Sequence, residues 1–151
     1  MSIFNAFNSS ASALTAGRLR MDIISSNIAN AQTTRATMNE NGEYEAYRRK
    51  MAVVTPKNKS FQSLLDKATR THYNAGSGVE VSKIMEDETP FKYVYQPAHP
   101  DADEEGYVQL PNVDPLKEMV DLMSATRSYE ANVTALNASK NMLMKALEIG
   151  K

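Results

Sequence analysis

Apolar residues recur every seven positions at both ends of this 151-residue chain, and the stretch between the ends is polar and irregular. Near the N-terminus the repeat runs through Phe7, Leu14, Met21 and Ile28, with Ile3 and Ile24 beside it. Near the C-terminus it runs through Leu122, Tyr129, Leu136 and Leu143, with Met119, Val133 and Leu147 beside it. Seven-residue spacing keeps one stripe of a helix facing a partner helix over many turns. The pattern therefore predicts a long helix at each end, each with an apolar stripe that needs a partner.

The C-terminal helix has clear start and stop signals. Asp114 suits the N-cap, Pro115 suits the first helical position, and Glu118 adds negative charge near the positive end of the helix dipole. Because Gly150 is a natural stop, we predict a helix over residues 115–149, on the order of 50 Å long. A compact domain of this size has a radius of only about 15 Å. The helix must therefore protrude or contact other chains.

The N-terminal helix, predicted from residue 3 to about residue 31, also has a seam in which half of the residues are small. The seam consists of Ile3, Ser10, Gly17 and Ile24. Small residues allow another helix to come close, and Gly17 costs about 1 kcal/mol of helix stability relative to alanine. Several serines add further weak helix formers. We expect this helix to be poorly ordered alone and to form against partners.

The middle of the chain alternates between apolar and polar residues in places, as β-strands do. One strand candidate lies within 44–54, where its best run is 51–54 before Pro56. Two further candidates are 79–84 and 91–95. Residues 61–70 fit either a brief helix or no regular element, and residues 74–78 are a flexible break. An acidic turn follows, bracketed by Pro97, Pro100 and Pro111.

These patterns together predict a mainly α fold. The long N- and C-terminal helices pair as a coiled-coil-like hairpin, and a small, irregular, β-containing segment lies between them in the sequence. The predicted organisation has three parts: an N-terminal helix with an Asn-rich turn over 1–34, the β and loop segment over 35–112, and the C-terminal helix over 113–151.

Charge and composition exclude several classes of protein. The chain has 17 Lys and Arg against 18 Asp and Glu, a balance that gives no long-range attraction to nucleic acid or anionic lipid. We interpret the densest basic run, 48–50, as a solvated strand edge. There is no cysteine, and no apolar run approaches the roughly 20 residues of a membrane span. Residues 1–5 do not begin a cleaved signal peptide, which taken alone would place the protein in the cytoplasm.

The sequence contains little catalytic or metal-binding chemistry. His72 and His99 are the only histidines, neither has a ligand-spaced partner, and no glycine-rich phosphate loop is present. The run 101–106 resembles the opening of a calcium loop, but the twelfth position, which should be a bidentate Glu, is Asn112. A solvated acidic turn is the favoured interpretation. We therefore expect a protein that is not an enzyme and has no metal or cofactor.

Both ends of the chain resemble known motifs. Residues 12–31, whose core element is Ser26-Asn27-Ile28-Ala29-Asn30, are similar to the N-terminal motif of bacterial flagellar rod and hook proteins, and residues 118–123 and 125–133 are similar to their C-terminal motif. The insert between the motifs is short, and 97–103 and 106–113 resemble a proximal rod protein in particular. The motif residues carried over are Ser26, Asn27, Ala29, Asn30, Arg127, Tyr129, Glu130, Ala131 and Asn132.

The resemblance implies a structural subunit of the flagellar basal-body rod. Such proteins are exported unprocessed through the flagellar type III apparatus and polymerise in the periplasm into the drive shaft between rotor and hook. This replaces the cytoplasmic location suggested above. Its partners would be further copies and other rod subunits, with no nucleic acid and no membrane insertion.

We expect the two stripes to form the helix–helix interfaces of the assembly. The interface residues are Phe7, Leu14, Met21, Ile24, Ile28, Met119, Leu122, Tyr129, Val133, Leu136, Leu143 and Leu147. Packing within one subunit and packing between subunits both fit this set. The motif residues Asn27, Asn30 and Asn132 fit either caps and surface positions or register-setting hydrogen bonds.

Two other functions fit parts of the sequence. A cytoplasmic coiled-coil adaptor or chaperone would use the same stripes to bind a partner helix. A calcium-dependent binding module would use Asp101, Asp103 and Glu105.

Overall fold

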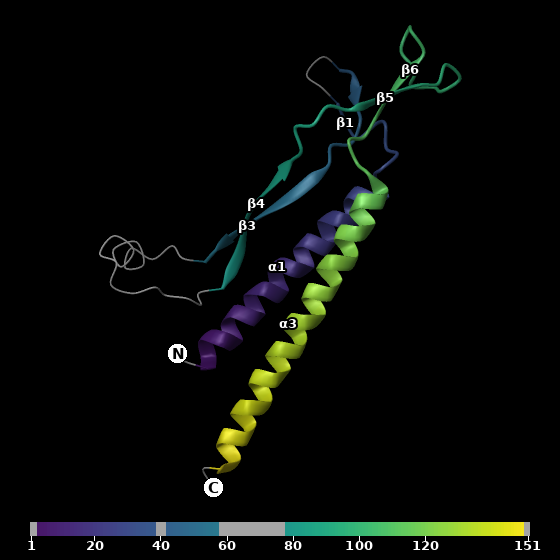
Figure 1. Ribbon diagram of the computed structural model, residues 1–151. Coiled ribbons are helices and arrows are strands. Elements are labelled where there is room, and N and C mark those ends of the chain that lie inside the picture. The colour runs from purple at the N-terminus through teal and green to yellow at the C-terminus, as the bar shows by residue number, and fades with distance from the viewer. Residues whose placement is uncertain (1–2, 39–41, 58–77, 150–151) are drawn as a thin grey trace. The chain divides into compact units, whose positions relative to one another are not determined.

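The computed structural model describes residues 3–38, 42–57 and 78–149 (Figure 1). Two long helices, α1 (Ile3–Ala29) and α3 (Pro115–Ile149), begin and end this part of the chain. Between them lie six strands: β1 (Thr37–Met38), β2 (Tyr44–Glu45), β3 (Lys50–Pro56), β4 (Val79–Glu86), β5 (Lys92–Tyr95) and β6 (Tyr107–Leu110). The predicted brief element at 61–70, most of the predicted break at 74–78, and His72 lie outside the described residues.

The predicted helices are confirmed. Helix α3 has the predicted bounds, and α1 ends two residues before the predicted residue 31. Asp114 caps α3, because its Oδ1 accepts hydrogen bonds from the backbone N–H groups of Leu116 (3.1 Å) and Lys117 (3.4 Å). The coiled-coil pairing of the two helices remains a prediction.

The described strands form three two-stranded sheets, β1–β2, β3–β4 and β5–β6. Strands β3, β4 and β5 confirm the three strand candidates, whereas β1 and β6 were not predicted. In β5–β6 the antiparallel register pairs Tyr93 with Gln109 and Tyr95 with Tyr107. Gly106, directly before β6, has φ +83°, and a Cβ there would lie 2.9 Å from the Tyr95 ring. Glycine is therefore required at this turn.

The chain divides into two compact units, which we describe separately. The first unit contains residues 1–19, 53–83 and 125–151. Among its described residues the buried side chains are all small, namely Ala16, Ala125 and Ser139. A Cβ placed on Gly17 would lie 3.7 Å from Cδ2 of Tyr129, so α1 and α3 come close at this glycine. Small residues thus mark the close approach in this unit, as the N-terminal seam predicted.

The second unit contains residues 20–52 and 84–124. Its apolar core combines side chains from α1, from the segment around β2 and from the segment around β6. The buried apolar residues are Ile23, Ile24, Ala46, Tyr47, Val108 and Val113. Two polar side chains, Asn27 and Glu118, are each only 1% exposed in the same unit. The division of the chain into three consecutive parts remains a prediction.

No helix within the described ranges is long and apolar enough to cross a membrane.

Candidate functional site: a buried polar junction

Asn27 is the centre of a buried polar cluster in the second unit. Its Nδ2 donates to the backbone oxygen of Lys50 (2.9 Å) and to Oε2 of Glu118 (3.0 Å). Its Oδ1 accepts from the backbone N–H of Lys50 (2.9 Å) and from the hydroxyl of Tyr47 (3.1 Å). All four hydrogen-bonding positions of the amide are therefore used. Asn27 pairs with both backbone groups of Lys50 as a neighbouring strand would, and so fixes the end of α1 against the start of β3.

Glu118 connects the same cluster to α3. Besides accepting from Asn27, its carboxylate receives a hydrogen bond from Nε of Arg49 at 2.7 Å. A buried carboxylate is stable only when it is paired and hydrogen-bonded, and Glu118 meets both conditions. The sequence suggested only a favourable charge near the helix dipole. The structure adds that Glu118 joins the first turn of α3 to both α1 and the segment before β3.

Arg49 supplies the positive charge of the cluster. It also contacts Asp87 (3.4 Å) and Asp121 (3.8 Å), and its side chain is only 17% exposed. Burial alone would lower the pKa of Arg49, but the hydrogen bond and charge of Glu118, with Asp87, raise it above its ordinary value. The pKa of Asp87 is lowered, first by the backbone hydrogen bond from Thr89 and then by Arg49 among other contacts.

The interpretation of residues 48–50 as a solvated strand edge is wrong for two of the three side chains. Arg49 lies in the buried cluster, and Arg48 pairs with Glu45 (2.8 Å) and lies 4.3 Å from the centre of the Phe91 ring. Only Lys50 is exposed. The sequence gave no sign of the burial of Arg49 because its partners Asp87 and Glu118 are distant along the chain. We name the cluster of Asn27, Tyr47, Arg49, Lys50, Asp87, Glu118 and Asp121 the polar junction.

The three motif asparagines differ in their contacts. Asn27 bridges distant segments, whereas Asn30 donates to the backbone oxygen of Ser26 (2.9 Å) and Asn132 donates to that of Ser128 (2.9 Å), each within its own helix or its end. Ser26 lies 3.4 Å from the Tyr47 hydroxyl. The remaining motif residues Ala29, Arg127, Glu130 and Ala131 are exposed, and Tyr129 is half-buried.

The structure places the twelve predicted interface residues at different depths. Ile24 is buried, and Met119 and Leu147 are exposed. The others are half-buried, namely Phe7, Leu14, Met21, Ile28, Leu122, Tyr129, Val133, Leu136 and Leu143. Sequence reasoning missed further exposed apolar residues on α3, which lie off the chosen stripe: Leu116, Val120, Met123, Met142, Met144 and Ile149. A seven-residue template selects one face, so it passed over apolar residues on the others.

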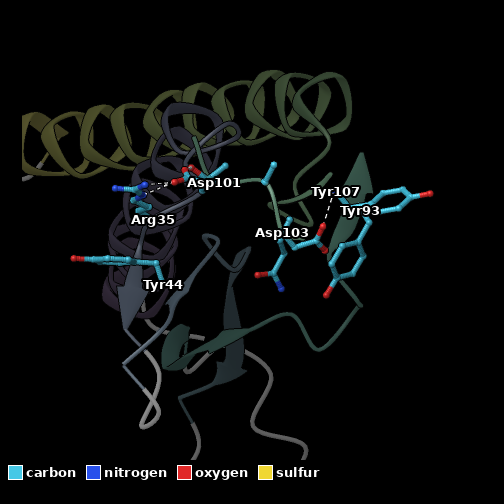
Figure 2. Close-up of a pocket in the computed structure, with 9 residues that line it drawn as sticks. Arg35, Tyr44, Tyr93, Asp101, Asp103 and Tyr107 are labelled. Atoms are coloured by element: carbon cyan, nitrogen blue, oxygen red, sulfur yellow. Dashed lines mark hydrogen bonds and ion pairs between the residues drawn. The ribbon is translucent and has the colours of Figure 1, made fainter. Parts of the chain in front are cut away.

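The acidic turn before β6 is held by contacts within the protein. Asp101 accepts hydrogen bonds from Oγ1 of Thr34 (2.7 Å) and Nε of Arg35 (2.6 Å), and these bonds, Thr34 first, lower its pKa (Figure 2). Oδ1 of Asp103 accepts from the backbone N–H groups of Glu105 (3.1 Å) and Tyr107 (2.8 Å). Within the described ranges, no three His, Asp or Glu side chains are grouped as metal ligands. Asp101 and Oδ1 of Asp103 thus have structural partners within the protein, which favours the interpretation as an acidic turn.

Two family models match the chain. The model described as "Flagella basal body rod protein" matches residues 7–37, which include most of α1 and Asn27 of the polar junction. The model described as "Flagellar basal body rod FlgEFG protein C-terminal" matches residues 104–149, which include β6 and α3. The two matches define the class of the protein, a flagellar rod protein.

Full-length relatives make the assignment more specific. The chain is 63% identical over 151 residues to the flagellar basal-body rod protein FlgC of Bacillus subtilis (strain 168), covering 100% of both chains. It is 42% identical to FlgC of Borreliella burgdorferi, covering 99% of this chain and 98% of that one. It is 39% identical to FlgC of Salmonella typhimurium (strain LT2), again over 100% of both. The chain belongs to the FlgC family of flagellar basal-body rod proteins.

Family membership confirms the predicted function and class. The protein is a structural subunit of the flagellar basal-body rod, it is not an enzyme, and it assembles with other rod components. Its location is the flagellar basal body, which corrects the cytoplasmic expectation drawn from the N-terminus alone. The adaptor or chaperone alternative is thereby set aside.

Proposed function

We propose that this subunit is exported unprocessed by the flagellar type III apparatus and polymerises through its terminal helices into the periplasmic part of the rod. There it would form part of the drive shaft between rotor and hook. Membership of the FlgC family supports a role in the rod. The export route and the mode of assembly are our proposal, which rests on the physical character of the two helices.

The observation that carries the proposal is the apolar surface of α3. Eight large apolar side chains of this helix are at least half exposed: Leu116, Met119, Val120, Met123, Met142, Met144, Leu147 and Ile149. Exposed apolar area costs roughly 25 cal/mol per Å² relative to burial. Large exposed apolar surfaces usually mark interaction sites. Neighbouring subunits would cover this surface in the rod.

The polar junction and the apolar stripes would have different roles, the first within one subunit and the second between subunits. The junction satisfies every hydrogen-bonding position of Asn27 within one subunit, so it would set how the end of α1, the start of β3 and the start of α3 meet. A subunit of defined shape can then repeat one head-to-tail contact. Repetition that does not close a ring produces a helical tube. Close-packed helices in such a tube would resist deformation under torque.

The first unit suits export through a narrow channel. Among the described residues its fully buried side chains are small, and its large apolar side chains are only half-buried or exposed, so packing within one subunit leaves part of their apolar area in water. Helices with little tertiary support unfold readily, because most helical stability in proteins comes from packing of an amphipathic face. The helices would therefore unfold easily for export and gain most of their packing from neighbours.

Replacing Leu136 by Asp tests the assembly route. Leu136 lies on the C-terminal stripe and is half-buried in the single subunit, so under the proposal contact with a neighbouring subunit would bury a carboxylate there without a partner. We expect the variant to be exported normally but to be absent from isolated basal bodies, and the cells to be non-motile. Immunoblots of the periplasmic fraction and of isolated basal bodies measure both steps.

The matched control is Asn137→Asp, which introduces the same residue at the next position, where the native side chain is polar and exposed. This variant should assemble. Normal motility of Leu136→Asp cells would contradict the proposed interface, and retention of that variant in the cytoplasm would show that the stripe acts in export instead.

A further inference from the structure

A pocket of about 340 Å³ lies in the second unit, beside the acidic turn. Figure 2 shows Arg35 and Tyr44 on one side of it and Tyr93, Tyr107 and Asp103 on the other. The residues come from the segment after α1, from β2 and from both strands of the β5–β6 hairpin. None of them belongs to the apolar stripes or to the polar junction.

The walls of the pocket are aromatic and accessible. Tyr44, Tyr93 and Tyr107 are 57%, 64% and 41% exposed. On the hairpin, the residue pairs Tyr93–Gln109 and Tyr95–Tyr107 share one face, because alternate residues of a strand point to the same side. The opposite face carries Val108, which is buried. The pocket therefore opens on the side of the hairpin that the core leaves uncovered.

The charge of the pocket is negative. Arg35 is neutralised by its ion pair with Asp101, and its guanidinium lies 5.5 Å from the centre of the Tyr44 ring. Oδ1 of Asp103 accepts two backbone hydrogen bonds, while Oδ2 has no hydrogen bond or ion pair within the described residues. The neighbouring Glu104 and Glu105 are exposed and add to the negative potential.

We propose that this pocket receives a lysine or arginine side chain from a neighbouring subunit of the rod. A cation held over the face of a tyrosine ring is attracted to it, by about 0.5–1 kcal/mol at exposed sites and more when water is excluded. Asp103 supplies the opposite charge at the pocket wall. Tyrosine is also a residue type that dominates binding energy at protein interfaces. The contact rests on membership of the rod and not on the proposed role of the terminal helices.

A photo-cross-linking experiment identifies the occupant. Tyr93 is replaced by p-benzoyl-phenylalanine in motile cells, and basal bodies are irradiated, isolated and digested for mass spectrometry. The matched control carries the same residue at Tyr95, which is 62% exposed on the same face but does not line the pocket. We expect position 93 to cross-link to a peptide of a second rod subunit next to a Lys or Arg, and position 95 not to reach that peptide.

Charge variants then test the chemistry. Asp103→Asn keeps the Oδ1 acceptor for the turn and removes the charge, whereas Glu104→Gln removes the same charge one residue away, outside the pocket. Loss of the charge contact should lower the yield of the position-93 cross-link about tenfold in the first variant and much less in the second, which changes only the surrounding potential. Asp103→Lys should restore the yield only when the identified cation is changed to Glu.

Three results would overturn the proposal: equal yields in the two charge variants, cross-links to peptides without Lys or Arg, and cross-links to no second polypeptide, including attachment to saccharide or lipid alone. These results differ from a failure of the helix-based assembly. If the helix-based assembly is wrong, the Leu136→Asp variant will be found in basal bodies. If the pocket contact is wrong, the chain will still be found in basal bodies but the expected cross-link will be absent.

Discussion

In α3, a charged residue of the first turn is buried and apolar residues of the last turns are exposed, which is the reverse of the usual relation between polarity and burial. At the start, in the second unit, Glu118 is charged and only 1% exposed, held by Asn27 and Arg49. At the end, in the first unit, Leu147 and Ile149 are apolar and 72% and 85% exposed. Within the single chain, polar contacts therefore bury a charged side chain at one end of α3, while apolar side chains at the other end stay exposed.

The physical reason lies in the directionality of the two interactions. Hydrogen bonds and ion pairs require defined geometry, so a cluster such as the polar junction specifies one arrangement of the segments that it joins. Apolar contact is non-directional and scales with area, so a stripe can pack against more than one kind of neighbour. A rod subunit that assembles with other rod components can use both kinds of contact.

Among the variants, Asn27→Asp should cause the largest loss of stability, because it disrupts the polar junction. The substitution keeps the shape of the side chain, removes both donors that reach Lys50 and Glu118, and places a second carboxylate beside Glu118. We expect the free energy of unfolding of the second unit to fall by about 3–5 kcal/mol. Urea unfolding followed by the fluorescence of the tyrosines, which include the buried Tyr47, measures the change. An unfolding midpoint equal to that of the wild type would show that the junction does not specify the fold.

Glu118→Gln should have the next largest effect. The amide keeps one acceptor oxygen but loses the charge that pairs with Arg49, so we expect a loss of about 2–3 kcal/mol. Glu130→Gln is the matched control on the same helix, since Glu130 pairs with Arg127 on the surface and both side chains are mostly exposed. That change should cost about 0.5 kcal/mol or less. Equal losses in the two variants would remove the distinction between the junction and the surface of α3.

An acid titration gives the smallest and most local test. The pKa values of Asp87 and Asp101 in the folded chain are lowered below the ordinary value of 3.8. A carboxyl group with a lowered folded pKa stabilises the fold above its unfolded pKa, and this stabilisation is lost as the pH falls through the folded value. The wild type should therefore exceed Asp101→Asn in stability at neutral pH, and the gap should close below about pH 4. A gap that stayed constant from pH 7 to pH 2 would contradict the assigned ionisation.

Local signals predicted much of the secondary structure. Asp114 and Pro115 marked the start of α3 to the residue, and alternation marked β3, β4 and β5. Strand β6 was missed because its four residues follow an acidic turn and have only β5 as a partner. The close approach at Gly17 was foreseeable, since a glycine in a helical seam has few other uses. Stripe packing and the docking of a cation in the pocket remain predictions.

By itself, the sequence determined the two long helices, their apolar stripes and the likeness of both ends to rod proteins, because capping, periodicity and motifs are all properties of neighbouring residues. Only the tertiary structure decided which polar side chains are buried. Asn27 and Glu118 are 91 positions apart, and Arg49 looked like a surface cation until Glu118 and Asp87 were placed beside it. Burial of a polar group depends on partners that only the folded chain brings within hydrogen-bonding distance, so no local pattern could mark the polar junction.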